Sequence, residues 1–348
     1  MHAASRAEPS PLYWGRRGRG SAPRASEAVV QPVRAVDSPP YQVDPNALGR
    51  FDRRRTAFAL ERRGAESLPP YEPAGHGGLD GDDLVARIAR TVHNRFGLVF
   101  DGDRPASQRP AGDHPPAGSD PAANAEAVRR AARRFGADLV GIGRVNPLWV
   151  YSHDEDGRPV KLPASHRWAV VLGTAMDAEA IRSSPGPAAS AATQLGYMRM
   201  AIHAHCVARF VQALGHGAVA CRNDTALSIP LAIDAGLGEL GRHGLLITPR
   251  FGPCVRISKV FTDMPLAADW PIEHGVAEAC RECRRCVEAC GAGAVSDADE
   301  PSFRTVCPAN NPGVRRWAVD ALACLAAWRR HGRSCSNCIA ACPFTPGA

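Results

Sequence analysis

The cysteines near the end of this 348-residue chain constrain its fold more than any other feature. The first run has the spacing C-x2-C-x2-C-x3-C and consists of Cys280, Cys283, Cys286 and Cys290. The second run has the same ending, followed by proline, and its first member is displaced upstream; it consists of Cys324, Cys335, Cys338 and Cys342. This spacing is typical of bacterial ferredoxins with two iron–sulfur clusters, in which the fourth cysteine of each run ligates the other cluster.

The crossover rule divides these eight cysteines into two sets. The x2 spacings wrap a tight loop around three corners of a cubane, and the x3 cysteine begins a helix that leads away. We assign one [4Fe–4S] cluster to Cys280, Cys283, Cys286 and Cys342, and the other to Cys290, Cys324, Cys335 and Cys338. Cys307, which precedes Pro308, is the alternative to Cys324, and Gly291 stands where a proline usually follows the first run.

Two other uses of cysteine fit less well. Zinc sites use pairs of C-x2-4-C, and no zinc pattern requires two C-x2-C-x3-C endings. A disulfide framework suits small secreted domains. This chain is long, no signal peptide is recognisable, and 45% hydrophobic residues suffice for a core.

The charge is concentrated at the N-terminal end. Residues 1–63 contain twelve arginines, no lysine and six acidic residues, and so carry +6 of the formal net charge of +7. We interpret residues 1–40 as a basic, disordered arm, and expect no nucleic-acid partner because no binding motif accompanies the charge. The run 53–55 is followed by charged residues rather than an apolar export signal, and no apolar stretch approaches 18 residues. We therefore expect a cytoplasmic protein without a transmembrane helix.

Helical and strand patterns alternate between the arm and the cysteines. Helices are predicted at 80–98, at 121–135 after the capping residue Asp120, and at 190–214, and strands at 139–142, 168–172, 218–220 and 254–259. A proline-rich linker or insertion is expected over 102–124. This order favours a layered α/β or α+β core over 41–272, with the cysteine-bearing domain over 273–348.

A glycine motif lies within this core. Gly236, Gly238 and Gly241 fit G-x-G-x-x-G, but no convincing strand precedes them and no long helix follows, which argues against a dinucleotide-binding unit. Either the backbone approaches a large ligand here, or the segment is a turn-rich loop.

Several segments together resemble the catalytic subunit of the reductive dehalogenases, which remove halide from organohalides with a corrinoid and iron–sulfur clusters. They are residues 50–52, 131–142, 196–200, 227–238, 247–253, 259–265 and 338–344. The resemblance implies a nitroreductase-like, cobalamin-binding α/β core followed by a ferredoxin-like domain with two [4Fe–4S] clusters. It also implies a small organohalide substrate, an external low-potential electron donor and, in exported members, a small membrane-anchor subunit.

The resemblance to the tetrachloroethene-type members assigns three catalytic residues, Tyr197, Asn223 and Arg256. A tyrosine can supply the proton that replaces the halogen, and a guanidinium stabilises the resulting phenolate. Asn223 would orient the hydroxyl or the halide. The cobalamin contacts implied with it are Ser228, Gly236, Gly238 and Gly244. The family leaves cobalt without a protein ligand, so none is assigned among His203, His205, His216 and His243.

Two alternatives remain open at this point. Epoxyqueuosine reductase is a related corrinoid and iron–sulfur enzyme that acts on transfer RNA, and a basic face on the folded core would favour it. A ferredoxin-like electron carrier that has lost its corrinoid would contain iron and sulfide without cobalt. The other cysteines, Cys206, Cys221 and Cys254, are interpreted as small core residues.

Overall fold

A four-stranded antiparallel sheet lies at the centre of the computed structural model, which describes residues 31–64, 82–100 and 118–347, the last six residues of the middle range as backbone only. Its strands, in the order β2-β3-β7-β4, are β2 (Leu139–Arg144), β3 (Trp168–Ala175), β7 (Val255–Thr262) and β4 (Ala218–Cys221). β3 pairs with β7 along its whole length, from Trp168 opposite Thr262 to Ala175 opposite Val255. The strand predictions are confirmed, and the mixed helix-and-sheet class with them.

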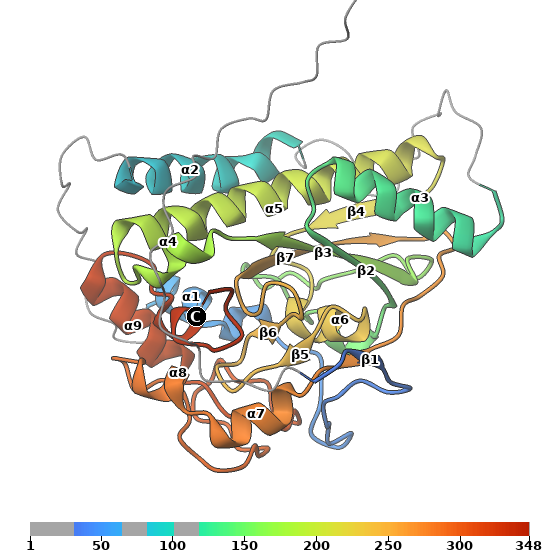
Figure 1. The fold of residues 1–348 in the computed structure, drawn as a ribbon. Helices are drawn as coiled ribbons and strands as arrows, with labels where there is room; N and C mark the ends of the chain where they lie inside the picture. Colours follow the sequence, from blue (N-terminus) through green and yellow to red (C-terminus); the bar gives the residue numbers. More distant parts are fainter. Residues whose placement is uncertain (1–30, 65–81, 101–117, 348) are drawn as a thin grey trace, which may run out of the picture.

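Helices cover one face of the sheet (Figure 1). α5 (Pro187–Ala213) and α3 (Pro121–Arg134) lie against the sheet, α2 (Asp82–Phe100) packs on the outer side of α5, and the short α4 (Ala178–Arg182) precedes α5. α3 begins as predicted, because the Asp120 carboxylate accepts a hydrogen bond from the backbone N–H of Ala122 and caps the first turn. The predicted linker therefore ends before Pro121, and its residues 102–117 lie outside the described part of the chain.

In α2 the large apolar residues face outward, although their helical spacing suggests a buried face. Leu84 and Ile88 are exposed, at 46% and 53%, whereas Ala86 and Ala89 are buried against α5. Small side chains let the two helix backbones approach closely, so alanines rather than the large apolar residues form the contact.

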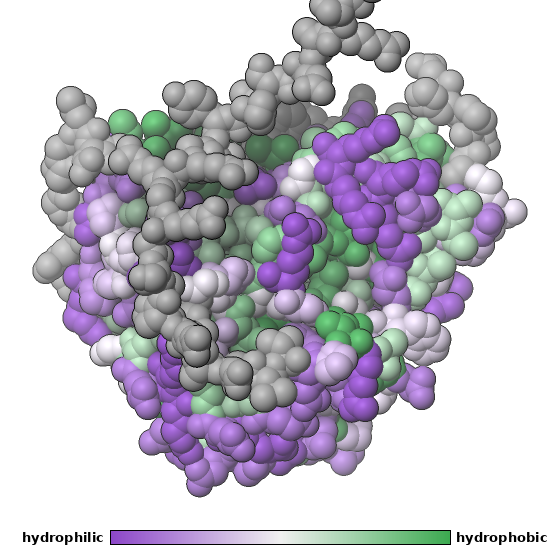
Figure 2. Space-filling model, viewed as in Figure 1, coloured by the Kyte–Doolittle hydropathy of each residue, from purple (hydrophilic) through white to green (hydrophobic). Residues whose placement is uncertain are grey.

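Figure 2 shows apolar side chains over this end of the molecule and mainly hydrophilic ones over the cysteine-bearing part below.

Strand β7 is buried on both faces. Ile257 and Phe261 belong to the core cluster below the sheet, whereas Val260 packs in the cluster under α5 and α3. The alternation seen in the sequence therefore separates two interiors rather than an interior from solvent. As a result Lys259 is completely buried in the middle of the strand.

The opposite face of the sheet carries shorter elements. These are α6 (Ser228–Asp234), the hairpin β5 (Glu239–Leu240) and β6 (Leu246–Ile247), the 3-10 turns η1 (Arg53–Arg55) and η2 (Pro147–Trp149), and α1 (Ala57–Arg62). Below them lie the cysteine-bearing helices α7 (Val276–Glu282), α8 (Arg285–Glu288), α9 (Ala321–His331) and α10 (Asn337–Ala340). The G-x-G-x-x-G segment runs from the end of α6 into the hairpin and opens no helix.

The N-terminal segment is partly structured. β1 (Arg34–Ala35) pairs antiparallel with β8 (Ile272–Glu273), and Arg34 forms an ion pair with Glu273 at 2.6 Å. This corrects the expected arm over 1–40, since its last residues belong to a small sheet; residues 1–30 lie outside the described residues. Within the described ranges, none of the helices combines the length and the apolar character needed to cross a bilayer.

Candidate active site

A pocket of about 520 Å³ lies below the sheet, between its strands and the cysteine-bearing segment. We call it the central pocket. Its walls come from the N-terminal segment, the C-terminal half of the core and the loop between the two cysteine runs; among the lining residues are Phe51, Thr56, Tyr197, Asn223, Ser228, Gly244, Arg256, Asn311, Arg316 and Ile339. All three predicted catalytic residues thus line one cavity.

Tyr197 and Arg256 contact each other directly. Arg256 Nη1 donates a hydrogen bond to the Tyr197 hydroxyl at 3.4 Å, and the guanidinium carbon lies 4.4 Å from the centre of the tyrosine ring. Gly196, the residue before Tyr197 on α5, allows this contact, because a Cβ there would lie 2.9 Å from Arg256 Cγ. The arginine can therefore stabilise negative charge on the phenol oxygen.

Asn223 lies on a loop that a buried lysine holds in place. Lys259 Nζ donates hydrogen bonds to the carbonyl oxygens of Arg222 and Ala226, at 2.5 and 2.9 Å, and to Ser228 Oγ at 3.0 Å. These contacts flank Asn223 on both sides. Burial lowers the pKa of Lys259 to about 8.

The same loop contains a backbone outlier. Thr225 adopts a φ of 66°, in the left-handed region that β-branched residues rarely occupy. Its carbonyl accepts a hydrogen bond from the backbone N–H of Tyr151 at 2.9 Å. The strain is local to the segment that presents Asn223, and the lysine anchors offset it.

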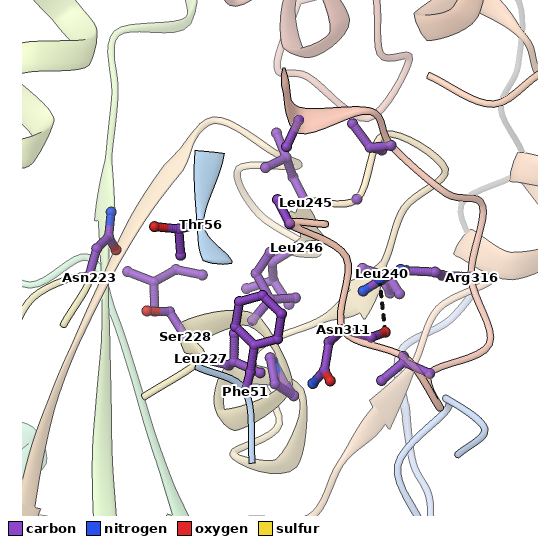
Figure 3. Close-up of a pocket in the computed structure, with 18 of the residues that line it drawn as sticks. Phe51, Thr56, Asn223, Leu227, Ser228, Leu240, Leu245, Leu246, Asn311 and Arg316 are labelled. Atoms are coloured by element: carbon purple, nitrogen blue, oxygen red, sulfur yellow. Dashed lines mark hydrogen bonds between the residues drawn. The ribbon is translucent and has the colours of Figure 1, made fainter. Parts of the chain in front are cut away.

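The middle of the central pocket is apolar. Figure 3 shows Phe51, Leu227, Leu245 and Leu246 between Asn223 on one side and Arg316 on the other. Part of this wall is fixed by Asp234, which accepts hydrogen bonds from the Tyr41 hydroxyl at 2.6 Å and from Trp149 Nε1 at 3.0 Å. Burial raises the pKa of Asp234 to about 6.

The four predicted cobalamin contacts do not all lie in this pocket. Ser228 and Gly244 line it, whereas Gly236 and Gly238 do not. Gly236 and Gly238 both have positive φ and face the chain's own backbone. A Cβ at Gly236 would lie 2.4 Å from the Trp270 carbonyl oxygen, and a Cβ at Gly238 would lie 2.1 Å from the Ile247 carbonyl oxygen. Turn geometry accounts for these two glycines without a ligand.

The first cysteine set surrounds a small cavity of its own. Its lining contains Cys280, Cys283, Cys286 and Cys342, together with Arg242, His243 and Phe344. Burial, followed by the neighbouring thiols of the set, raises the pKa of Cys286 to about 11. A cluster binds these sulfurs as thiolates, so its assembly must release their protons.

The thiols assigned to the second set, including Cys290 from the first run, influence one another. Burial raises the pKa of Cys324 to about 11, and the next contributions come from Cys335 and then Cys290. Burial also raises the pKa of Cys338, and the thiols of Cys324, Cys335 and Cys290 raise it further. Cys307 lies apart, with its thiol directed to the Val319 carbonyl at 3.9 Å. This grouping favours Cys324 over Cys307 as the displaced ligand.

No group of three Cys, His, Asp or Glu side chains in the described part of the chain converges tightly enough for a single metal ion. This does not conflict with the two cysteine sets, because a cubane's own iron and sulfide atoms keep its four thiolates further apart than one ion would.

Arg242 is a functional candidate that no sequence pattern indicated. It is 1% exposed and donates hydrogen bonds to the carbonyl oxygens of Cys280, Ser296 and Ala298. Its backbone N–H lies 3.4 Å from Cys280 Sγ, and its guanidinium stacks on Trp317 at 4.5 Å. The residue joins the β5–β6 hairpin to the first cysteine set and places positive charge beside it.

The remaining residues singled out in the sequence are largely structural. Cys221 and Cys254 are buried at 1% exposure, as expected of core residues, and Cys206 is partly buried. His203 Nδ1 lies 3.0 Å from Thr174 Oγ1 within the α5–sheet interface. Burial lowers the pKa of His203 to about 4, so the ring is neutral at physiological pH.

Comparison with known proteins agrees with this geometry, although no family model matches the chain. A tetrachloroethene reductive dehalogenase of Desulfitobacterium hafniense is 37% identical over 262 residues, which cover 63% of this chain and 48% of the relative. The enzyme of the same name from Sulfurospirillum multivorans is 35% identical over 250 residues, with 63% and 50% covered. The matched part of the chain is thus similar in sequence to the reductive dehalogenases.

Solved structures extend the similarity. A catabolic reductive dehalogenase, determined in complex with 3-bromo-4-hydroxybenzoic acid, superposes with a TM-score of 0.71 at 26% identity, covering 89% of this chain and 44% of that one. Another reductive dehalogenase structure, described as suggesting a mechanism for B12-dependent dehalogenation, gives the same TM-score at 27% identity, with 89% and 44% covered. The chain thus spans about half the length of the reductive dehalogenases that it matches.

Proposed function

We propose that this chain is a corrinoid- and iron–sulfur-dependent reductive dehalogenase that replaces a halogen by hydrogen in a small organohalide. The observation that supports this best is the meeting of Tyr197, Asn223 and Arg256 in one pocket, directly above two sets of four cysteines. A proton donor, an apolar chamber and electron-carrying clusters are the three parts that such a reaction requires.

The domain assignment follows from the same arrangement. Residues 41–272 form the proposed nitroreductase-like core, and residues 273–348 the proposed ferredoxin-like domain with two [4Fe–4S] clusters. The central pocket lies where they meet, since its lining includes both Leu246 of the core and Ile339 of the cysteine-bearing part. The clusters would be held by the two cysteine sets described above.

The central pocket suits a corrinoid in its chemistry. Its middle is lined by apolar side chains, as is usual for sites of organic cofactors. Two buried donors that line it, Arg256 Nε and Asn311 Nδ2, have no hydrogen-bond partner within the protein. Ser228 and Gly244 would contact the cofactor; Gly236 and Gly238 would support the fold nearby. When bound, the corrinoid supplies the low-valent cobalt that delivers electrons to the carbon–halogen bond.

The protein's own side chains handle the proton and the leaving group. The overall reaction consumes two electrons and one proton, breaks the carbon–halogen bond, forms a carbon–hydrogen bond and releases halide. The Tyr197 hydroxyl donates the proton to carbon, and Arg256 stabilises the phenolate that remains. Asn223 donates a hydrogen bond to the halide or the hydroxyl. The apolar walls exclude water and favour an uncharged organohalide.

The electrons would come from an external low-potential donor through the two cysteine sets. Ile339, which lines the central pocket, directly follows Cys338 of the second set, and Gly244 separates the pocket from Arg242 and His243 beside the first set. A small membrane-anchor subunit is a further proposed partner, and no nucleic-acid partner is proposed.

The weaker alternative is an enzyme like epoxyqueuosine reductase. The Escherichia coli enzyme of that name is 36% identical over 69 residues, which cover only 20% of this chain. Incubation with transfer RNA containing epoxyqueuosine would test it, and conversion to queuosine would replace the dehalogenase proposal.

The direct test is Tyr197→Phe in protein reconstituted with clusters and cobalamin. We expect halide release to fall by about 10²-fold or more, because the proton donor is lost. Iron and cobalt contents should equal those of the wild type, which controls for damage to the sites. Free cobalamin at the same concentration gives the background rate. Unchanged turnover above that background would exclude the proton-donor role.

A further inference from the structure

Opposite the catalytic residues, the central pocket ends in an arginine without an anionic partner. Arg316 Nη2 donates one hydrogen bond, to the Asn311 carbonyl oxygen at 3.0 Å (Figure 3). Within the described ranges it forms no ion pair, whereas Arg53, another lining residue, pairs with Glu155 at 2.7 Å. Burial lowers the pKa of Arg316, and only the neighbouring Cys307 thiol acts in the opposite direction. A partly buried cation of this kind is stabilised by an anion.

The adjacent amide is also unsatisfied. The Asn311 side chain is 6% exposed, and its Nδ2 is buried without an acceptor in the protein. Its neighbour Asn310 is fully used by the fold, since Nδ2 donates to the Val319 carbonyl at 2.9 Å and Oδ1 accepts from the Val306 N–H at 2.9 Å. Asn310 is thus structural, whereas Asn311 presents a free donor beside a free positive charge.

The position of this pair indicates what it binds. It lies on the other side of the apolar middle from Asn223 (Figure 3), so a small organohalide in contact with Tyr197 does not reach it. The corrinoid of the proposed function is large enough to span the pocket, and its nucleotide tail carries a phosphodiester with two unesterified oxygens. Such a group accepts charge-assisted hydrogen bonds from a guanidinium and an amide together.

We propose that Arg316 and Asn311 form a phosphodiester-binding site that recognises the nucleotide tail of the corrinoid. The proposal rests on the proposed function, because it requires a corrinoid in the central pocket. It predicts selectivity between complete cobalamin and cobinamide, which has the same ring but lacks the nucleotide and its phosphate.

The test compares the affinities of cluster-reconstituted protein for hydroxocobalamin and for aquacobinamide, by ultrafiltration with cobalt measured in the retained fraction. Wild-type protein should bind cobalamin about tenfold or more tightly than cobinamide, the size of one or two charge-assisted hydrogen bonds. Arg316→Gln should remove most of this preference and leave cobinamide affinity unchanged. Asn311→Asp should lower cobalamin affinity further, since it places a carboxylate beside the phosphate. Arg316→Lys should retain part of the preference.

Arg315→Gln is the matched control. Arg315 is the adjacent arginine, is not among the residues that line the pocket, and contacts the Pro301 carbonyl, Gln42 and Glu300 instead. It should leave both affinities unchanged.

Three results would overturn the proposal. Equal losses for both corrinoids in Arg316→Gln would place the contact on the corrin ring, and no loss for either would show that the pair binds another anion, such as a carboxylated substrate. Wild-type protein that binds neither corrinoid would refute the proposed function as well, which separates that failure from a failure of the phosphate site alone.

Discussion

At the scale of single residues, the proposed chemistry depends on how closely α5 approaches β7. Gly196 leaves room for the arginine side chain, with a potential Cβ 2.9 Å from Arg256 Cγ and 3.1 Å from Met176 Cγ. Gly196→Ala should therefore push Arg256 away from Tyr197 and lower halide release about tenfold or more, while alanine is itself favourable within a helix. Gly49→Ala is the control, because nothing lies within 4 Å of a Cβ there. Full activity in Gly196→Ala would show that the Tyr197–Arg256 contact is not needed.

Lys259 supports a second residue-scale prediction, since the chain has only one other lysine, the exposed Lys161. Lys259→Met leaves two buried carbonyls without their donor, so the free energy of unfolding should fall by about 3 kcal/mol, against little change in Lys161→Met. The Asn223 loop would lose its anchors, and halide release should fall with it. Urea denaturation under anaerobic conditions gives the comparison.

The lowered pKa of Lys259 should make the folding stability depend on pH. Its pKa is about 8 in the folded protein, below the ordinary value of about 10.4 expected when the chain is unfolded. Between these values the unfolded chain binds more protons, so the contribution of Lys259 to stability rises with pH, by up to about 3 kcal/mol. The difference between wild type and Lys259→Met should therefore grow from pH 8 to pH 10.5. A constant difference across this range would mean that Lys259 titrates normally.

At the scale of elements, the packing of α2 on α5 depends on small side chains. Ala89 is 1% exposed at this interface, so Ala89→Leu should overpack it and destabilise the protein by about 1–3 kcal/mol. Ile88→Ala, one position away and outward-facing, should change stability by less than about 0.5 kcal/mol. Thermal unfolding of the two variants measures this difference. A larger effect in Ile88→Ala would mean that another surface covers that face.

Helix starts and strand positions could be predicted from the sequence because their causes are local. Asp120 before Pro121 specifies a capped helix, and the cysteine spacing predicts two sets, with either Cys324 or Cys307 as the displaced member. Burial could not be predicted in the same way. Alternation over residues 254–259 predicted a strand, but covering layers on both sides bury Lys259, and only the assembled sheet determines that.

The pocket also includes parts that sequence reasoning did not connect. Phe51 and Thr56 are about 170 positions from Asn223, yet they share the central pocket. Arg242 and Arg316 carry no motif, and their importance follows from what surrounds them. Arg242 contacts backbone carbonyls and Cys280, and Arg316 lines the central pocket without an ion-pair partner among the described residues. Such residues emerge only when segments distant in sequence are brought together.

At the scale of the whole molecule, the proposed corrinoid would lie between an α+β core and a cysteine-bearing part. Residues from both line the central pocket, and Arg242 joins them through carbonyls at Cys280 and Ala298. Loss of either cofactor type should therefore weaken the other's site. The electron-carrier alternative differs on this point, because it needs the clusters alone.

The most direct measurement is the iron and cobalt content per chain of anaerobically reconstituted protein, after excess iron, sulfide and cobalamin have been removed. The account predicts about eight iron atoms and about one cobalt atom, the sum of two four-iron clusters and one corrinoid. Iron near eight with no retained cobalt would contradict it, and would favour an electron carrier over a dehalogenase.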